Sequence, residues 1–270
     1  MKVRTKPGHP LWELTLARLL EFWRSPATIF WVFGFPVVLA VVLGIAFREK
    51  GEQSYRAAVP EATLEEQTEQ DNERYIDFLL PGLIGMNMMS SCMWGIGYAI
   101  VDSRKRKLLK RFAATPMNRA HYLLSFMFSR LLFLILEVGL LLLFGWLVFD
   151  VSVNGSLLAI WGIAVLGAMT FSGMSVLVAS RTDSTEVASG WMNLIMMPMW
   201  LFSGAFFDYH RFPEIAHPFI RMLPLTAVND SLRALVNDGS SLFTLGVELL
   251  VLVMWGGISF FLALRLFRWQ

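Results

Sequence analysis

The sequence predicts an all-α membrane protein with six transmembrane helices, and two observations carry that prediction. Six apolar runs fill most of the chain, each near the ~20 residues that a helix needs to cross a ~30 Å hydrocarbon core. Charged residues make up only 16% of the chain, against about 25% in ordinary soluble domains. Because lipid offers backbone groups no water, such runs cross a membrane as helices. The expected spans are residues 28–47, 79–101, 123–149, 157–180, 187–207 and 242–264.

Length and cysteine content exclude several classes of function. Six spans within 270 residues leave no room for a separate soluble catalytic domain, so a nucleotide-driven motor has to be another chain. The single cysteine, Cys92, lies inside the second expected span, which excludes a disulfide framework and a cysteine metal cluster. The first residues carry positive charges but no apolar segment with a cleavage site, so we expect them to be retained.

Lysine and arginine in the connections predict the orientation. The connection 102–122 holds seven of these residues against one acid, Asp102, whereas the loop 48–77 holds nine acids against four basic residues. Basic connections stay on the cytoplasmic side. We therefore expect a multi-pass protein of the plasma membrane, the bacterial inner membrane, with both termini cytoplasmic and the acidic loop 48–77 outside.

Residues 11–24 precede the first span and form an amphipathic pattern. At 100° per residue, one arc holds the tryptophans and leucines Trp12, Leu16, Leu19, Leu20 and Trp23, and the opposite half holds polar residues that include Arg18 and Glu21. This pattern predicts a helix lying in the cytoplasmic interface. A membrane anchor is favoured over a docking helix for a cytoplasmic partner.

The segment 103–117 combines a basic sequence with an apolar helical side. Leu108, Leu109 and Phe112 form that side, and Thr115–Pro116 ends the helix. Topology alone explains the basic residues, but it does not explain apolar residues in a solvated connection. They favour a short cytoplasmic coupling helix pressed into a cleft on another protein.

The outer segment 208–241 is apolar and aromatic, yet prolines interrupt it. Residues 226–236 predict a short helix that ends at Asn237–Asp238–Gly239. Broken backbone at membrane depth is tolerated only when protein buries it or when it lines a cavity. We therefore predict a re-entrant element near the outer leaflet.

Four stretches in this order resemble the membrane subunit of type-2 ABC exporters, in particular the daunorubicin-resistance-like permeases. They are FWRSPATIFWVFGFPVVLAVVLGIAF, YIDFLLPGLIGMNMM, RKRKLLKRFAATPMNRAHYLLSF and SGAFFDYHRFPEIAHPFIRMLPLTAVNDSLRAL. The resemblance covers essentially the whole chain. One departure concerns the basic segment, where family members often carry a glutamate and this chain has only Asp102.

The resemblance implies a half-transporter. Two permeases, identical or homologous, would surround one pathway, powered by two cytoplasmic ABC ATPase subunits that bind ATP and magnesium. This chain has no GxxxxGK[ST] motif, so we expect no cofactor in it and no ATPase site of its own. Membrane lipid is an expected partner and nucleic acid is not. The residues expected to couple to the ATPase are Arg104, Lys105, Leu108, Leu109, Phe112, Thr115, Pro116, Arg18 and Glu21.

Methionine and tryptophan cluster in the second and fifth expected spans. The adaptable thioether of methionine suits a surface that accepts varied hydrophobic ligands, although packing or lipid contact explains any single residue. The resembled family lines its pathway with these helices. The expected pathway residues are Met86, Asn87, Met89, Met93, Trp94, Asn193, Met196, Met197, Trp200, Phe206 and Phe207.

Two charged residues, Arg130 and Glu137, lie seven apart in the third expected span, hence on one helical face and ~10 Å apart along the axis. A charge near the bilayer centre costs ~2.5–3.5 kcal/mol, so Glu137 has to be paired, neutral or facing water. Intramembrane acids are functional candidates, while a polar pair that locks helices together is nearly as well supported.

The function predicted from these features is an ATP-driven exporter permease that moves a hydrophobic or amphipathic molecule (a drug, lipid or secondary metabolite) out of the cytoplasm or inner leaflet. Export of a lipid-linked polysaccharide is the alternative. An intramembrane enzyme is a remote alternative, because all four histidines lie outside or at the edges of the spans and the spans hold no aspartate pair. No internal repeat supports a secondary transporter.

Overall fold

A computed structural model describes residues 9–46, 75–108 and 119–266, and within these residues the chain is helical without strands. The predicted all-α membrane fold is confirmed. In chain order the elements are α1 (Pro10–Trp23), α2 (Pro26–Ile29), the π-helix η1 (Phe30–Gly34), α3 (Phe35–Ala46), α6 (Tyr75–Cys92), the π-helix η3 (Met93–Tyr98), α7 (Ala99–Lys105), α9 (Arg119–Phe149), α10 (Leu157–Ala179), α11 (Thr185–Phe202), the 3-10 helices η4 (Tyr209–Arg211) and η5 (Glu214–Ala216), α12 (His217–Arg221), α13 (Pro224–Val236), the 3-10 helix η6 (Leu242–Thr244) and α14 (Gly246–Leu266).

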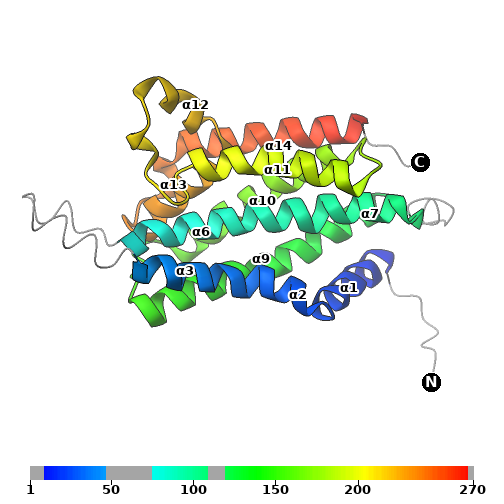
Figure 1. The fold of residues 1–270 in the computed structure, drawn as a ribbon, viewed down its shortest axis with the longest axis horizontal. Coiled ribbons are helices and arrows are strands. Elements are labelled where there is room, and N and C mark those ends of the chain that lie inside the picture. The colour runs from blue at the N-terminus through cyan, green and yellow to red at the C-terminus, as the bar shows by residue number, and fades with distance from the viewer. Residues whose placement is uncertain (1–8, 47–74, 109–118, 267–270) are drawn as a thin grey trace, which may run out of the picture.

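The long helices lie side by side along the long axis of the molecule (Figure 1). Helix α10 packs against α6, α9, α13 and α14, which places it at the centre of the bundle. Helices α1 and α7 lie at one end, here called the α1 end, and α12 and α13 lie at the opposite end, here called the α13 end (Figure 1). The α1 end corresponds to the side that the basic residues predict to be cytoplasmic.

Five helical segments are long and apolar enough to cross a membrane, in the part of the chain that the structure describes. They are Pro26–Ile45, Tyr75–Lys105, Leu124–Phe149, Leu157–Ala179 and Gly246–Leu266. Helix α11, which corresponds to the expected span 187–207, has 18 residues and includes Glu186 and Asn193. It lies alongside the other long helices (Figure 1), and its crossing of the membrane stays a prediction.

The first span is a continuous helix whose geometry changes around a proline. Pro36 has no N–H, so the carbonyl of Val32, four residues earlier, loses its helical donor. The turns before Pro36 form the π-helix η1, in which the Phe35 N–H reaches the Phe30 carbonyl. The side-chain amide of Asn87 on α6 donates to the Val32 carbonyl at 3.1 Å. The second span thus satisfies the group that the proline leaves open in the first.

The second span repeats this arrangement at its beginning. Pro81 lies inside α6 and leaves the Asp77 carbonyl without its helical N–H. The side-chain amide of Asn237, which follows α13, donates to that carbonyl at 3.1 Å. Further along, the π-helix η3 disturbs the backbone ladder, and the Ser175 hydroxyl of α10 donates to the Cys92 carbonyl at 3.0 Å. The helix continues through α7 to Lys105, four residues beyond the expected end at 101.

The outer segment 208–241 folds into short helices, and the longest of them, α13, packs between α6, α10 and α14. Helix α13 begins at Pro224 and its side chains are largely buried. Its Asn229 lies so close to α6 that a Cβ atom on Gly85 would stand 2.1 Å from the Asn229 Oδ1 atom. Only glycine fits there. Helix α13 is therefore buried in protein, whereas Ile215 of η5 and Phe219 of α12 are exposed. The re-entrant placement of the segment stays a prediction.

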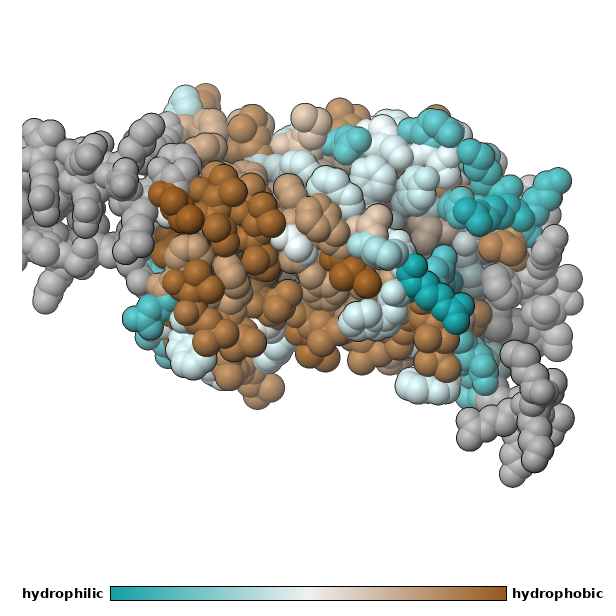
Figure 2. Space-filling view, turned by 60° about the horizontal axis from the view of Figure 1, so that its bottom comes forward, coloured by the Kyte–Doolittle hydropathy of each residue, from teal (hydrophilic) through white to brown (hydrophobic). Residues whose placement is uncertain are grey.

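The surface is apolar along the bundle and polar towards the α1 end. Figure 2 shows hydrophobic residues over most of the left and centre of one face, with hydrophilic residues gathered towards the end at which Figure 1 places α1 and α7. Many large apolar side chains of α3, α9, α11 and α14 are exposed. Water does not stabilise a surface of this extent, and contact with lipid does.

Candidate functional site

Helix α1 faces the bundle with Thr15, Arg18 and Phe22, and its exposed apolar residues are Trp12, Leu16, Leu20 and Trp23. Thr15 is buried, and the Arg18 Nε donates to the Ser125 hydroxyl of α9 at 3.0 Å. The Arg18 guanidinium also lies 3.0 Å from the centre of the Phe126 ring. Burial lowers the pKa of Arg18 from its ordinary value. Trp12 and Trp23 are exposed, which is the arrangement that a helix resting on lipid requires.

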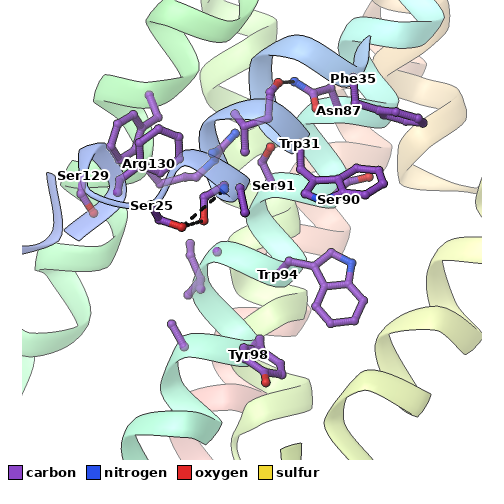
Figure 3. A pocket seen from close by; sticks show the side chains of 18 of the residues that line it. Ser25, Trp31, Phe35, Asn87, Ser90, Ser91, Trp94, Tyr98, Ser129 and Arg130 are labelled. Carbon is purple, nitrogen blue, oxygen red and sulfur yellow. Dashed lines mark hydrogen bonds between the residues drawn. The ribbon is translucent and has the colours of Figure 1, made fainter. Parts of the chain in front are cut away.

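A cavity of about 930 Å³ opens between α1 to α3, α6 with η3, α9 and α11. It extends from Arg18, Glu21 and Asp102 at the α1 end to Trp200 and Phe206 towards the α13 end. Its volume lies within the range of about 300–1,000 Å³ typical of small-molecule sites. Figure 3 shows Trp31 and Phe35 of the first span beside Asn87 and Ser90 of the second span, with Trp94 and Tyr98 further along the second span.

The cavity walls are mostly apolar and aromatic, with a polar patch near their middle. The apolar part includes Trp31, Phe35, Leu39, Met86, Trp94, Met196 and Phe206, and the polar part includes Ser25, Thr28, Asn87, Ser90, Ser91, Ser129 and Arg130. A pocket of this composition suits a ligand with a large apolar body and a few polar atoms.

The polar patch contains an ion pair at membrane depth. The Arg130 Nη1 donates to the Glu137 Oε1 at 2.8 Å, and a second bond joins Nη2 to Oε2. Both side chains are almost fully buried, with 6% and 2% exposed. The Ser91 hydroxyl of α6 lines the same polar patch of the cavity. Two charges that would each be costly in lipid are paired bidentately inside the protein.

The expected pathway residues separate into three groups. Met86, Asn87, Trp94, Met196, Trp200 and Phe206 line the cavity. Met89 and Met93 are buried in the core of the bundle instead. Asn193, Met197 and Phe207 are exposed and are not among the cavity-lining residues. About half of the expected pathway residues therefore line the cavity.

Other residues that line the cavity were not predicted from the sequence. Trp31 and Phe35 are four residues apart and present one aromatic face of the first span, a spacing that could have indicated a shared surface. Ser90 and Ser91 follow Asn87 by about one turn, and Ser129 adjoins Arg130. Because serine occurs at many helix contacts within membranes, its position alone gives no comparable signal.

Of the expected coupling residues, Arg104 has internal partners. Its guanidinium donates to the carbonyls of Ala179 and Thr182, both at 2.7 Å, and to that of Ser180 at 3.3 Å. These carbonyls belong to the end of α10 and the turn after it, where helical acceptors lack backbone donors. Arg104 is buried, so the structure gives it an internal contact with the α10–α11 turn and not an exposed surface.

Lys105 and the rest of the expected coupling set lie differently. The Lys105 ammonium group contacts the Glu186 carboxylate at 3.3 Å, and both side chains are exposed. The Ser184 hydroxyl, the Thr185 hydroxyl and Lys105 lower the pKa of Glu186 to about 2. Glu21 is exposed at the mouth of the cavity, and Leu108 is half-buried. Leu109, Phe112, Thr115 and Pro116 lie outside the described residues, as does most of the acidic loop 48–77.

Together, the fold and the apolar surface define a class of protein: a polytopic helical membrane protein, here with an open cavity between its spans. Residues 9–237 match the family model of the ABC-2 type transporter. The chain belongs to this family, and the resemblance noted from the sequence is confirmed. The family is that of a transport membrane subunit.

Two curated proteins are similar to parts of this chain. The "ABC transporter G family member 20" of Dictyostelium discoideum is 23% identical over 188 residues, which cover 68% of this chain and 26% of that protein. The "Nodulation protein J" of Rhizobium meliloti (strain 1021) is 28% identical over 113 residues, covering 42% of this chain and 43% of the relative. The chain thus matches less than half the length of each.

Proposed function

We propose that this chain is the permease of an ATP-driven exporter that moves a small hydrophobic or amphipathic molecule out of the cytoplasm or the inner leaflet. A drug, lipid or secondary metabolite is a substrate of this class. Two cytoplasmic ABC ATPase subunits supply the energy, and a second permease, identical or homologous, completes the transport unit. The complex works in the plasma membrane with both permease termini in the cytoplasm.

The observation that carries the proposal is the cavity between the spans. The cavity is lined by one residue from each methionine cluster, Met86 and Met196. The aromatic rings of Trp31, Trp94 and Trp200 also line it. The cavity reaches from the interfacial helix α1 towards the aromatic segment at Phe206. A molecule that enters near the α1 end can thus follow apolar contact through much of the membrane. The broad contact surface of methionine and aromatic residues suits varied substrates.

The size of the cavity favours a small amphiphile over a polysaccharide carried on a lipid. About 930 Å³ corresponds to one drug-sized ligand, and a chain of linked sugars exceeds that volume. The polar part of the wall is a short patch around Asn87 and Ser129, with apolar residues on either side. A polysaccharide needs polar contact along its whole passage.

Coupling to the ATPase uses the α1 end. Helix α7 continues the second span to Lys105, and Arg104 joins its end to the turn before α11. A force applied to the segment 103–117 therefore acts on spans two, four and five together, because one buried side chain connects them. Rigid-body tilting of packed helices is an established form of such transmission.

Reconstitution in proteoliposomes tests this function. The purified chain alone should hydrolyse no ATP, and addition of its ABC ATPase partner, identified by co-purification, should give ATP-dependent efflux of a fluorescent hydrophobic dye. A variant of that ATPase without its catalytic glutamate is the control. ATP hydrolysis by the isolated chain, or a complete complex that moves no amphiphile and exports a lipid-linked glycan, would contradict the proposal.

A further inference from the structure

We propose that the cavity contains a head-group subsite, built around Arg130, Glu137, Ser91 and Ser129, that binds the uncharged, hydroxyl-bearing end of a single-chain amphiphile. The inference deepens the proposed function and rests on it for the direction of transport, while binding itself can be measured separately. The subsite lies where the polar patch of the cavity meets spans two and three.

The first observation is an unused donor on a buried side chain. Arg130 lines the cavity and is 6% exposed. Its two Nη atoms bind Glu137, while its Nε has no hydrogen-bond partner within the part of the chain that the structure describes. A buried donor left unpaired costs about 1–3 kcal/mol. Protein atoms cover Nε in this conformation, so a ligand oxygen relieves that cost once the Arg130 side chain turns towards the cavity.

The same cavity is lined by serine hydroxyls that can act as acceptors. The Ser129 hydroxyl donates to the Ser125 carbonyl at 2.8 Å, and the Ser90 hydroxyl donates to the Met86 carbonyl at 2.8 Å. Each hydroxyl hydrogen is thus engaged within its own helix, so each oxygen can act only as an acceptor towards a ligand. A ligand hydroxyl both accepts and donates, so it matches one free N–H and neighbouring oxygens. A carboxylate or phosphate has no hydrogen to give these oxygens.

The charge around the cavity is the second observation, because it sums to zero. Arg130 is neutralised by Glu137 through two bonds. At the α1 end, Arg18 faces Glu21, and Asp102 pairs with Arg106 at 2.8 Å. Among the described residues that line the cavity, the two cations Arg18 and Arg130 are thus balanced by the two acids Glu21 and Asp102. A charged head group would lose its hydration without an equivalent gain.

The size and shape of the cavity indicate the apolar part of the ligand. Trp31, Phe35 and Leu39 continue the wall from the polar patch in one direction, towards the α13 end. One alkyl chain or fused ring system follows this wall, while a two-chain lipid exceeds about 930 Å³. The ligand is therefore a neutral amphiphile with one apolar body and a hydroxylated end.

Photoaffinity labelling tests the subsite on the full-length chain in lipid nanodiscs. The probes are three molecules with the same diazirine-bearing twelve-carbon chain: an alkylglycerol, an alkyl phosphate and an alkyltrimethylammonium. Labelled peptides are identified by mass spectrometry, and half-saturation is measured for each probe. We expect saturable labelling of cavity residues on α6 and α9 by the alkylglycerol at a concentration about tenfold or more below that of the charged probes. Equal half-saturation for a charged probe, or labelling confined to lipid-facing residues, would overturn the proposal.

Variants of the subsite residues test the head-group preference directly. Glu137→Gln leaves the Arg130 guanidinium without its counter-charge, so the preference should change from the alkylglycerol to the alkyl phosphate. Ser129→Ala removes one acceptor and preserves the ion pair, and it should weaken alkylglycerol labelling about two- to tenfold. If Glu137→Gln does not fold, Ser129→Ala carries the test alone. Leu136→Ala, on the exposed side of α9, is the matched control and should change nothing. An unchanged head-group preference in the folded variants would refute the subsite.

Two further measurements distinguish a single-chain ligand from membrane lipid, and binding from transport. Unlabelled dodecylglycerol should displace the probe, whereas dioleoylglycerol should not. Displacement by both to the same extent would mean that the cavity holds membrane lipid, which overturns the single-chain assignment. Labelling needs no ATPase, so selective labelling without ATP-driven efflux would count against the proposed function alone. Efflux without head-group selectivity would count against the subsite alone.

Discussion

The side-chain amide of Asn87 donates to the backbone carbonyl of Val32 at 3.1 Å, and Val32 is the residue whose helical partner Pro36 removes. Val32 and Asn87 both line the cavity, so this contact joins the first two spans at the cavity wall. Pro81, Asp77 and Asn237 repeat the arrangement at the start of the second span. In a membrane, where water cannot replace a missing donor, the partner has to come from a neighbouring helix.

A double-mutant cycle tests this relationship. Asn87→Ala should lower the free energy of unfolding by about 1–2 kcal/mol, because it leaves a carbonyl unpaired. In a Pro36→Ala background, the restored N–H can bind Val32, so the same change should cost about 0.5–1.5 kcal/mol less. Unfolding in mixed micelles with increasing sodium dodecyl sulfate measures these differences.

The matched control is Asn193→Ala on α11, where the asparagine is exposed. It should change stability by less than about 0.5 kcal/mol. Additive effects of Asn87→Ala and Pro36→Ala would mean that the amide contributes nothing through the Val32 carbonyl.

A second prediction concerns pH and Asp230 on α13. Burial is the main cause that raises the pKa of Asp230 to about 6, and nearby Glu248 adds to it, while Arg233, Tyr209 and His210 oppose it. The raised value means that the folded protein favours the protonated acid. Protonated Asp230 therefore adds to the free energy of unfolding. This contribution is complete below the ordinary pKa near 3.8 and is lost as pH rises through about 6.

Asp230→Asn imitates the protonated side chain and should remove this dependence. The gap of about two pH units corresponds to up to about 3 kcal/mol. Wild-type protein should lose thermal stability relative to Asp230→Asn between pH 4 and pH 7, as measured by the melting temperature in detergent. Glu214→Gln, on the exposed surface of η5, controls for a general loss of charge. Parallel melting curves for wild type and Asp230→Asn across this range would show that Asp230 titrates normally.

The sequence predicted the features that depend on local composition. Apolar runs and basic connections indicated the membrane bundle, and the amphipathic pattern at residues 11–24 corresponds to α1 at Pro10–Trp23. The polar side of that pattern contains Arg18, but the sequence could not show that Arg18 would lie on the ring of Phe126. Contacts between distant segments depend on the packing of the whole bundle.

The cavity residues show why the site was harder to predict than the fold. A π-helix adds one residue to a turn, so η3 rotates the residues beyond Met93 by about 100° relative to a regular helix. Asn87, Ser91, Trp94 and Tyr98 nevertheless line the cavity at helical spacing, whereas Met89 and Met93 belong to the core and do not line it. The sequence contains no local signal for the π-helix, because its stability comes from partners such as Ser175.

A third prediction separates two neighbouring basic residues. Arg104→Met should lower the free energy of unfolding by about 2–4 kcal/mol, since a buried cation serves three carbonyls at the end of α10. Lys105→Met should change it by less than about 1 kcal/mol, because the contact with Glu186 is exposed to solvent. Both variants remove one positive charge from the same turn, so topology and net charge are matched. Unfolding in mixed micelles measures both, and equal effects would contradict the internal role of Arg104.

The last prediction concerns the apolar side of the coupling segment, Leu109 and Phe112. We expect the double variant Leu109→Asp and Phe112→Asp to lose the ABC ATPase during co-purification, because a carboxylate entering a desolvated cleft loses its hydration without a partner. The double variant Lys110→Gln and Arg111→Gln lowers the net charge by the same amount and keeps the apolar side, so it should retain the ATPase. Affinity purification of the permease with quantification of the bound ATPase measures both. If the glutamine variant loses the ATPase and the aspartate variant keeps it, charge attraction holds the complex and the apolar side has another role.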